Sequence, residues 1–232
     1  MAGSSSPRRL TDTASLVLRA LHESADADRF PNRHYRGGAD VLGVRMGTVF
    51  EIAKRHQGMS LTEVERLLDE SAYEPRLSAF CILDFQVRRR DVTTAEREDR
   101  YRLYLDRHDR IDTWDMVDRA APRVVGLFLR DRSREPLFAL AAAADPLRRR
   151  TAMTAPLAYT RPAHREGIAD LLRLAEVLAD DADPVVSKPV GIALKHAGAV
   201  APEIVGAFLE RMGDRLSAAM RREARAKLPA GT

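Results

Sequence analysis

The chain has 232 residues, a formal net charge of +4 and one cysteine, Cys81. A chain of this length can bury a core without disulfides, and one cysteine excludes an internal disulfide framework. No stretch reaches the roughly 18 uncharged apolar residues of a membrane span, and residues 1–10 lack the apolar core of a signal peptide. We therefore expect a cytoplasmic protein with no membrane partner, in which Cys81 is a core residue.

Apolar residues recur at spacings of three and four along nearly the whole chain, which is the pattern of amphipathic helices. No segment shows the alternation that is typical of a strand. The predicted helical segments are 14–21, 44–55, 61–69, 76–87, 96–105, 114–120, 124–129, 137–143, 147–159, 168–178, 185–196, 204–208 and 216–227. The sequence thus predicts an all-α protein whose helices are joined by short loops.

Four dipeptides look like helix starts, each with a capping acid and often with proline at the first helical position. They are Glu74-Pro75, Asp112-Thr113, Asp145-Pro146 and Asp183-Pro184, spaced 38, 33 and 38 residues apart. This spacing is typical of helical-pair repeats and predicts an α-solenoid of HEAT-like repeats with a concave basic groove. We expect a single repeat domain over residues 11–228, with flexible tails at 1–10 and 229–232.

Counting from the repeat starts places an acid and two bases at nearly equivalent positions. Asp118 lies six residues into its repeat, and Arg150 and Lys188 each lie five residues into theirs. Side chains at equivalent positions of parallel helices should face one groove, where the two bases could neutralise the phosphates of a bound backbone. The alternative is a solvated helix face with ordinary ion pairs.

The only tryptophan, Trp114, precedes Asp118 by four residues, so the two side chains share a helix face. An indole plane beside a carboxylate can hold a sugar and stabilise positive charge that develops on it. The alternatives are a core or interface anchor for Trp114 and a capping or dipole partner for Asp118.

Nothing in the sequence predicts a metal or another cofactor. The six histidines have no pair at a spacing of four and no paired cysteines, so we expect them at the surface or in caps. They are His22, His34, His56, His108, His164 and His196.

Four motifs, in this order and spacing, resemble the AlkD-type DNA alkylation-repair glycosylases over about residues 30–210. They are Leu42-Gly43-Val44-Arg45-Met46, Trp114-Asp115-Met116-Val117-Asp118, Arg149-Arg150-Thr151-Ala152-Met153 and Lys188-Pro189-Val190-Gly191. The resemblance implies HEAT-like repeats and a monofunctional glycosylase that releases N3- or N7-alkylated purines from duplex DNA. We expect the protein to act as a monomer and without a cofactor.

The resemblance also implies roles for particular residues. The family's catalytic aspartate falls on Asp118, its sugar-facing aromatic on Trp114 and its phosphate-binding arginine on Arg150. Its tyrosine near the lesion falls on Tyr35, and Arg45 falls on a polar or basic position close to the DNA. Two further basic residues of the motifs, Lys188 and Arg149, are expected to bind DNA as well.

The chain departs from the family pattern on its C-terminal side. Ile192 follows the Lys188 motif where the family usually has a second tryptophan. Pro189 stands inside a predicted helix, where it removes a backbone hydrogen bond and would kink the segment unless the helix began near Ser187. Two other functions therefore stay open: binding of damaged or distorted DNA without cleavage, and a scaffold for other proteins.

Overall fold

The computed structural model describes residues 13–35, 37–162 and 166–229. Within these ranges the regular elements are all helices, which confirms the all-α prediction. None of the described helices is both long and apolar enough to cross a membrane. The predicted tail at residues 1–10 and the last three residues of the tail at 229–232 lie outside the described residues.

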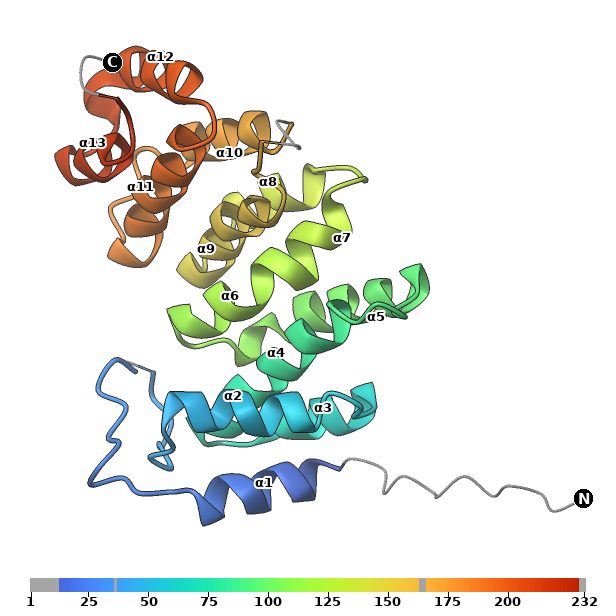
Figure 1. Cartoon of the computed structure of the whole chain (residues 1–232). Helices are drawn as coiled ribbons and strands as arrows, with labels where there is room; N and C mark the ends of the chain where they lie inside the picture. Colours follow the sequence, from blue (N-terminus) through green and yellow to red (C-terminus); the bar gives the residue numbers. More distant parts are fainter. Residues whose placement is uncertain (1–12, 36, 163–165, 230–232) are drawn as a thin grey trace, which may run out of the picture. The chain divides into compact units, whose positions relative to one another are not determined.

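The chain divides into two compact units, Met1–Val92 and Thr93–Thr232. The helices of the first unit are α1 (Ala14–Glu23), α2 (Met46–Arg55), α3 (Leu61–Asp69) and α4 (Tyr73–Val87) (Figure 1). Helix α4 packs against the other three, and all its residues except Phe85 are buried. Its apolar run is buried, and Cys81 is a core residue within it, as predicted.

Residues 24–45 join α1 to α2 without a helix in their described part (Figure 1). A buried carboxylate on α4 holds this segment. Glu74 is 0% exposed. Its Oε2 accepts a hydrogen bond from the backbone N–H of Leu42 (2.8 Å), and its Oε1 accepts from those of Gly43 (2.9 Å) and Val44 (3.2 Å). The side-chain amide of Asn32 donates to the same Oε1 at 2.6 Å.

The prediction that Glu74 caps a helix start is therefore wrong. Helix α4 begins at Tyr73, and its N-cap is Ala72, which offers no side-chain acceptor. Glu74 lies inside the first turn, and its carboxylate satisfies the N–H groups of a segment about thirty residues earlier in the chain. A buried carboxylate is stable only when such donors replace its water shell.

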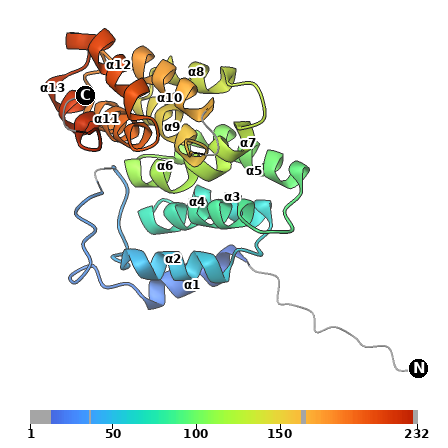
Figure 2. The same cartoon turned by 45° about the horizontal axis from the view of Figure 1, so that its top comes forward.

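The second unit contains the remaining helices. They are α5 (Thr94–Asp106), α6 (Trp114–Ala121), α7 (Leu127–Leu129), α8 (Glu135–Ala141), α9 (Pro146–Thr154), α10 (Glu166–Val177), α11 (Pro184–Gly198), α12 (Pro202–Met212) and α13 (Ala218–Arg225). Helices α6, α9 and α11 lie side by side, with α9 in contact with both neighbours (Figures 1 and 2). These three helices begin at or next to three of the predicted repeat starts.

Two of the predicted helix caps are present in this unit. The side chains of Asp145 and Asp183 each accept a hydrogen bond from the backbone N–H two residues later, both at 2.9 Å. A proline follows each of them at the first helical position, where its missing N–H costs nothing. The start of α6 differs, because its N-cap is Thr113, whose side chain makes no capping hydrogen bond.

Helix α6 does not end cleanly but continues into a π-helical segment, Pro122–Gly126. The predicted helix 124–129 is therefore split between this segment and α7. The π segment packs against the 3-10 turn Ala155–Ala158, and Gly126 permits the close approach. A Cβ on Gly126 would lie 2.0 Å from the carbonyl oxygen of Ala155, closer than any packed pair of atoms.

Candidate active site

An ion pair between Asp118 on α6 and Arg150 on α9 forms the centre of the site. Arg150 Nε donates to Asp118 Oδ1 at 2.8 Å, and Nη2 donates to Oδ2 at 2.6 Å. The Asp118 side chain is 38% exposed, whereas that of Arg150 is 8% exposed. Two parallel hydrogen bonds from a buried guanidinium fix the plane of the carboxylate, and its outer edge stays open to solvent.

Pro189 explains how the guanidinium of Arg150 is held from its other side. Helix α11 runs through Pro189, so the expected alternative of a helix start near Ser187 is wrong. Proline has no N–H to donate to the carbonyl four residues earlier, which is that of Val185. Arg150 Nη1 donates to this carbonyl instead, at 2.8 Å. The guanidinium thus bridges the Asp118 carboxylate and the backbone of α11.

The open edge of the carboxylate faces a cavity of about 160 Å³, which we call the Asp118 cavity. Its walls come from α6, the π segment, α9, the following 3-10 turn and α11. The lining residues are Asp118, Pro122, Arg150, Thr154, Leu157, Pro189 and Ile192. Sequence reasoning did not predict Pro122, Thr154 or Leu157, because their place depends on the π segment and the turn that packs on it.

The indole of Trp114 is exposed at the start of α6, at 41%. The guanidinium carbon of Arg150 lies 5.5 Å from the centre of the indole ring, within cation–π range. Trp114, Arg150 and Asp118 therefore form one contiguous group, with the indole on its solvent side.

No aromatic side chain lines the Asp118 cavity among the residues that the structure describes. Ile192 lines it instead and is 45% exposed. Tyr159 and Phe208, two aromatics elsewhere in this unit, are buried in the core. The departure noted in the sequence thus leaves an exposed aliphatic side chain at this wall, and none of the described aromatics replaces it.

The other two predicted bases of this unit lie apart from the ion pair. Lys188 is exposed on α11 and lines a different cavity, described below. Arg149 donates through Nε to Asp181 Oδ2 at 2.6 Å and through Nη1 to the carbonyls of Ala143 and Ala144. Of the three residues predicted to face one groove, Asp118 and Arg150 are paired and line the Asp118 cavity, whereas Lys188 lines the other cavity.

Tyr35 and Arg45 belong to the first unit. Tyr35 is buried at 8% exposure, and its ring stacks on that of Tyr73 with centroids 4.5 Å apart. Its hydroxyl oxygen accepts hydrogen bonds from Ala39 N (3.0 Å) and from Arg76 Nη2 (3.3 Å). Arg45 is exposed at the N-cap of α2.

A buried histidine that contacts α9 corrects another prediction. His108 is 0% exposed, so its expected place at the surface or in a cap is wrong. Its Nε2 lies 3.0 Å from Thr151 Oγ1, which also lies 2.9 Å from the hydroxyl of Tyr104. In the sequence, the spacing of four residues between Tyr104 and His108 is the feature that could have indicated that the two side chains share a partner. No cluster of His, Cys, Asp and Glu in the described ranges could hold a metal ion.

Burial, together with the nearby charge of Arg148, lowers the pKa of His108 to about 4, from an ordinary value near 6.5. Between these pH values the unfolded chain binds a proton that the folded chain does not, so stability should fall as the pH drops from about 6.5 toward 4. We expect His108→Gln to remove this part of the pH dependence of the free energy of unfolding. Urea denaturation between pH 7 and pH 5 measures it, with the exposed His22→Gln as control. An unchanged slope in His108→Gln would contradict the assignment.

Comparisons with known proteins agree with this fold. A family model described as "DNA alkylation repair enzyme" matches residues 15–228. A predicted DNA alkylation repair enzyme from Enterococcus faecalis matches with a TM-score of 0.64 at 14% identity, over 95% of this chain and 98% of that one. AlkD2 from Streptococcus mutans matches with a TM-score of 0.56 at 15% identity, over 93% and 99%.

A third structure, smu.31 from Streptococcus mutans UA159, has a TM-score of 0.54 at 14% identity, over 93% of this chain and 94% of that one. Among curated proteins, none matches the chain. At these identities the structural likeness shows the fold, and it confirms the prediction of HEAT-like helical repeats.

Proposed function

Because the chain belongs to the family of DNA alkylation repair enzymes, we propose that it is a monofunctional glycosylase acting on cationic N3- or N7-alkylated purines in duplex DNA. One observation carries the proposal. The Asp118 carboxylate is fixed by a buried arginine, open on its outer edge to a cavity, and adjacent to an exposed indole. Duplex DNA is the proposed partner, and a monomer in the cytoplasm is the proposed working state.

The chemistry of such a substrate fits a site with one carboxylate. Alkylation at N3 or N7 gives the purine a positive charge, so the base leaves as a neutral molecule and needs no general acid. When the bond from C1′ to the base nitrogen breaks, its electron pair goes to the base and positive charge develops on the sugar. Asp118 stabilises that charge and orients the water whose oxygen bonds to C1′, while the water's proton leaves to the carboxylate or to solvent.

The ion pair with Arg150 sets the geometry of this stabilisation. Each Asp118 oxygen accepts one hydrogen bond from the guanidinium, which leaves acceptor sites on the outer edge of the carboxylate. The positive charge of Arg150 partly cancels the electrostatic field of the Asp118 carboxylate at distant points. The sugar must therefore lie in close contact with the carboxylate to be stabilised by it. We place C1′ in the Asp118 cavity, on the side away from Arg150.

The remaining predicted residues take supporting roles in the proposal. Trp114 packs on the deoxyribose and contributes a cation–π interaction of about 0.5 to 2 kcal/mol with the charged sugar. Arg150 uses three of its five N–H groups in the contacts described, and the other two are its donors for a phosphate. Lys188, Arg149, Arg45 and Tyr35 are the further proposed contacts to DNA.

One observation favours a second candidate function, a binder of damaged or distorted DNA that does not cleave it. Ile192 lines the Asp118 cavity in place of an aromatic, so one wall lacks the ring face that would favour a cationic sugar. Such a protein would distinguish damaged from undamaged duplex in binding and leave the glycosidic bond intact.

Release of the base is the test of the proposal. We expect the purified protein, incubated with a duplex containing N7-methylguanine, to liberate the free base and leave an abasic site. Chromatography of the released base and cleavage of the strand at the abasic site measure the two products, with the unmodified duplex as control. Tighter binding to the modified duplex without release from any cationic purine would establish the second candidate instead.

A further inference from the structure

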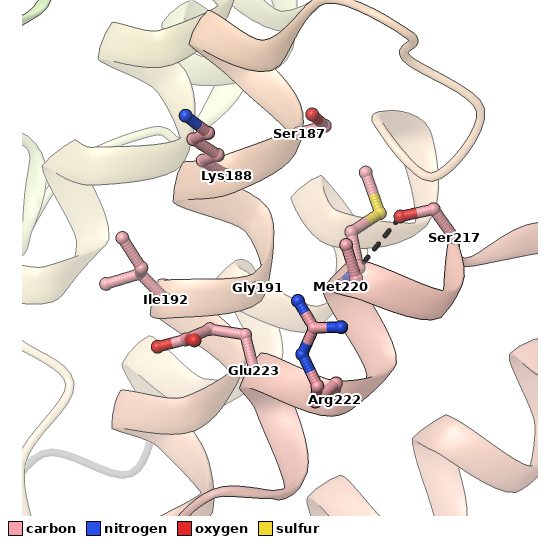
Figure 3. A pocket seen from close by; sticks show the side chains of 9 residues that line it. Ser187, Lys188, Gly191, Ile192, Ser217, Met220, Arg222 and Glu223 are labelled. Atoms are coloured by element: carbon pink, nitrogen blue, oxygen red, sulfur yellow. Dashed lines mark hydrogen bonds between the residues drawn. The ribbon is translucent and has the colours of Figure 1, made fainter.

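A second cavity, of about 310 Å³, lies between α11 and α13 (Figure 3), and we call it the α13 cavity. The two helices pack closely at Gly191, where an added Cβ would lie 3.1 Å from Glu223 Cβ and 3.3 Å from Met220 Cα. Ile192 lines both this cavity and the Asp118 cavity. A ligand that passes over Ile192 would therefore reach both.

The charged groups of the α13 cavity favour an anion. Lys188 on α11 and Arg222 on α13 both line it from opposite helices (Figure 3). Within the described part of the chain, neither forms an ion pair or a side-chain hydrogen bond. The one acid in the lining, Glu223, is already bound by Lys195. Two cations without an ion-pair partner thus border one cavity, whose acid already has a cationic partner.

Hydrogen-bond donors suited to an oxyanion complete the lining. Ser187 on α11 and Ser217 at the N-cap of α13 contribute hydroxyl groups (Figure 3). The Ser217 oxygen accepts from the backbone N–H of Met220 at 3.2 Å, so its hydroxyl proton remains able to donate to a ligand. Ser217 is also the N-cap of α13, and Ala219, in the first turn, borders the cavity. The positive end of the helix adds to the attraction for an anion.

We propose that the α13 cavity binds one backbone phosphate of the DNA strand whose sugar faces Asp118. The inference depends on the proposed function for the identity of the ligand. A sugar and its own phosphate are covalent neighbours, and Ile192 lies at the boundary of the two cavities that would hold them. Arg222 and Ser217 then belong to the DNA-binding surface together with Lys188, and Ile192 separates the reacting sugar from the phosphate.

Arg222→Gln tests the site, because it removes one of the two cations and keeps a side chain of similar length. We expect the dependence of duplex binding on salt to weaken, with the slope of log Kd against log salt falling by about 1. The control is Arg225→Gln, which removes an exposed arginine of the same helix that does not line the cavity. Fluorescence anisotropy with an undamaged duplex measures both slopes.

A double substitution tests whether Lys188 and Arg222 bind the same phosphate. Lys188→Gln and Arg222→Gln should each weaken binding, and the double variant should lose less than the product of the two losses, since contacts to one group are coupled. The inference is overturned if Arg222→Gln keeps the slope of the unmodified protein, or if Arg225→Gln loses as much. Base release is measured separately, so a normal rate of release with an unaffected slope rejects this site alone. A weakened slope without base release rejects the glycosylase alone.

Discussion

Asp118→Asn is expected to slow the release of N7-methylguanine by about 10²- to 10³-fold, the range found when one preorganised electrostatic group is removed from an active site. Asparagine keeps the shape of the side chain and one carbonyl acceptor, but it lacks the charge that stabilises the sugar. The rate of release under single-turnover conditions measures the effect, because it reports the chemical step without product release.

Binding and stability separate this effect from a loss of fold. Removing a negative charge beside DNA should leave duplex binding unchanged or slightly tighter, because phosphates are repelled less. The variant also leaves the buried guanidinium of Arg150 without its carboxylate, so its thermal unfolding must be compared with that of the unmodified protein.

Asp115→Asn is the matched control, since Asp115 lies on the same helix and lines neither cavity. It should retain the rate of release. Equal rates for Asp118→Asn and the unmodified protein would remove Asp118 from the chemistry and, with it, the proposed mechanism.

Glu74→Ala should lower the free energy of unfolding by about 3 to 5 kcal/mol, because it leaves several buried donors without an acceptor, each costing about 1 to 3 kcal/mol. The carboxylate accepts hydrogen bonds from three backbone N–H groups and from the amide of Asn32. These costs do not add fully, since the segment can relax and admit water. Urea denaturation monitored by circular dichroism measures the loss.

Two further variants test whether the loss of stability comes from the carboxylate of Glu74. Glu74→Gln keeps one acceptor oxygen but turns an N–H₂ toward the donors, so it should lose an intermediate amount. Glu51→Ala removes an exposed acid from α2 and should stay within about 0.5 kcal/mol of the unmodified protein. A Glu74→Ala protein as stable as Glu51→Ala would mean that the carboxylate does not hold the segment before α2. That segment carries Tyr35 and Arg45, so its loss should also weaken any DNA contact that they make.

The sequence predicts the helices well because their signals are local. Periodic apolar residues and the caps at Asp145 and Asp183 act within a few residues of the helices that they define. Glu74 and His108 were misplaced for the opposite reason. Their partners lie thirty or more residues away, at residues 42–44 for Glu74 and at Thr151 for His108, and no local pattern records such contacts.

The candidate site likewise has features that the sequence pattern predicts and contacts that it does not. The repeat spacing predicts that Asp118, Arg150 and Lys188 face one groove, and the structure pairs Asp118 with Arg150 but places Lys188 at the α13 cavity. The spacing does not reveal that Arg150 also contacts Val185, or that the π segment brings Pro122 to the cavity. Arg222 could not be assigned from the sequence, because only the packing of α13 on α11 at Gly191 places it opposite Lys188.

Pro189 and Arg150 form a coupled pair, with a consequence for how this site can change over evolution. The carbonyl of Val185 accepts from Arg150 where an ordinary helix would supply its own N–H. A residue with an N–H at position 189 would compete for that carbonyl and release one anchor of the guanidinium. Substitutions at positions 150 and 189 should therefore be correlated among close relatives of this chain. A relative without the proline should have a more mobile arginine, able to swing from the aspartate toward bound DNA.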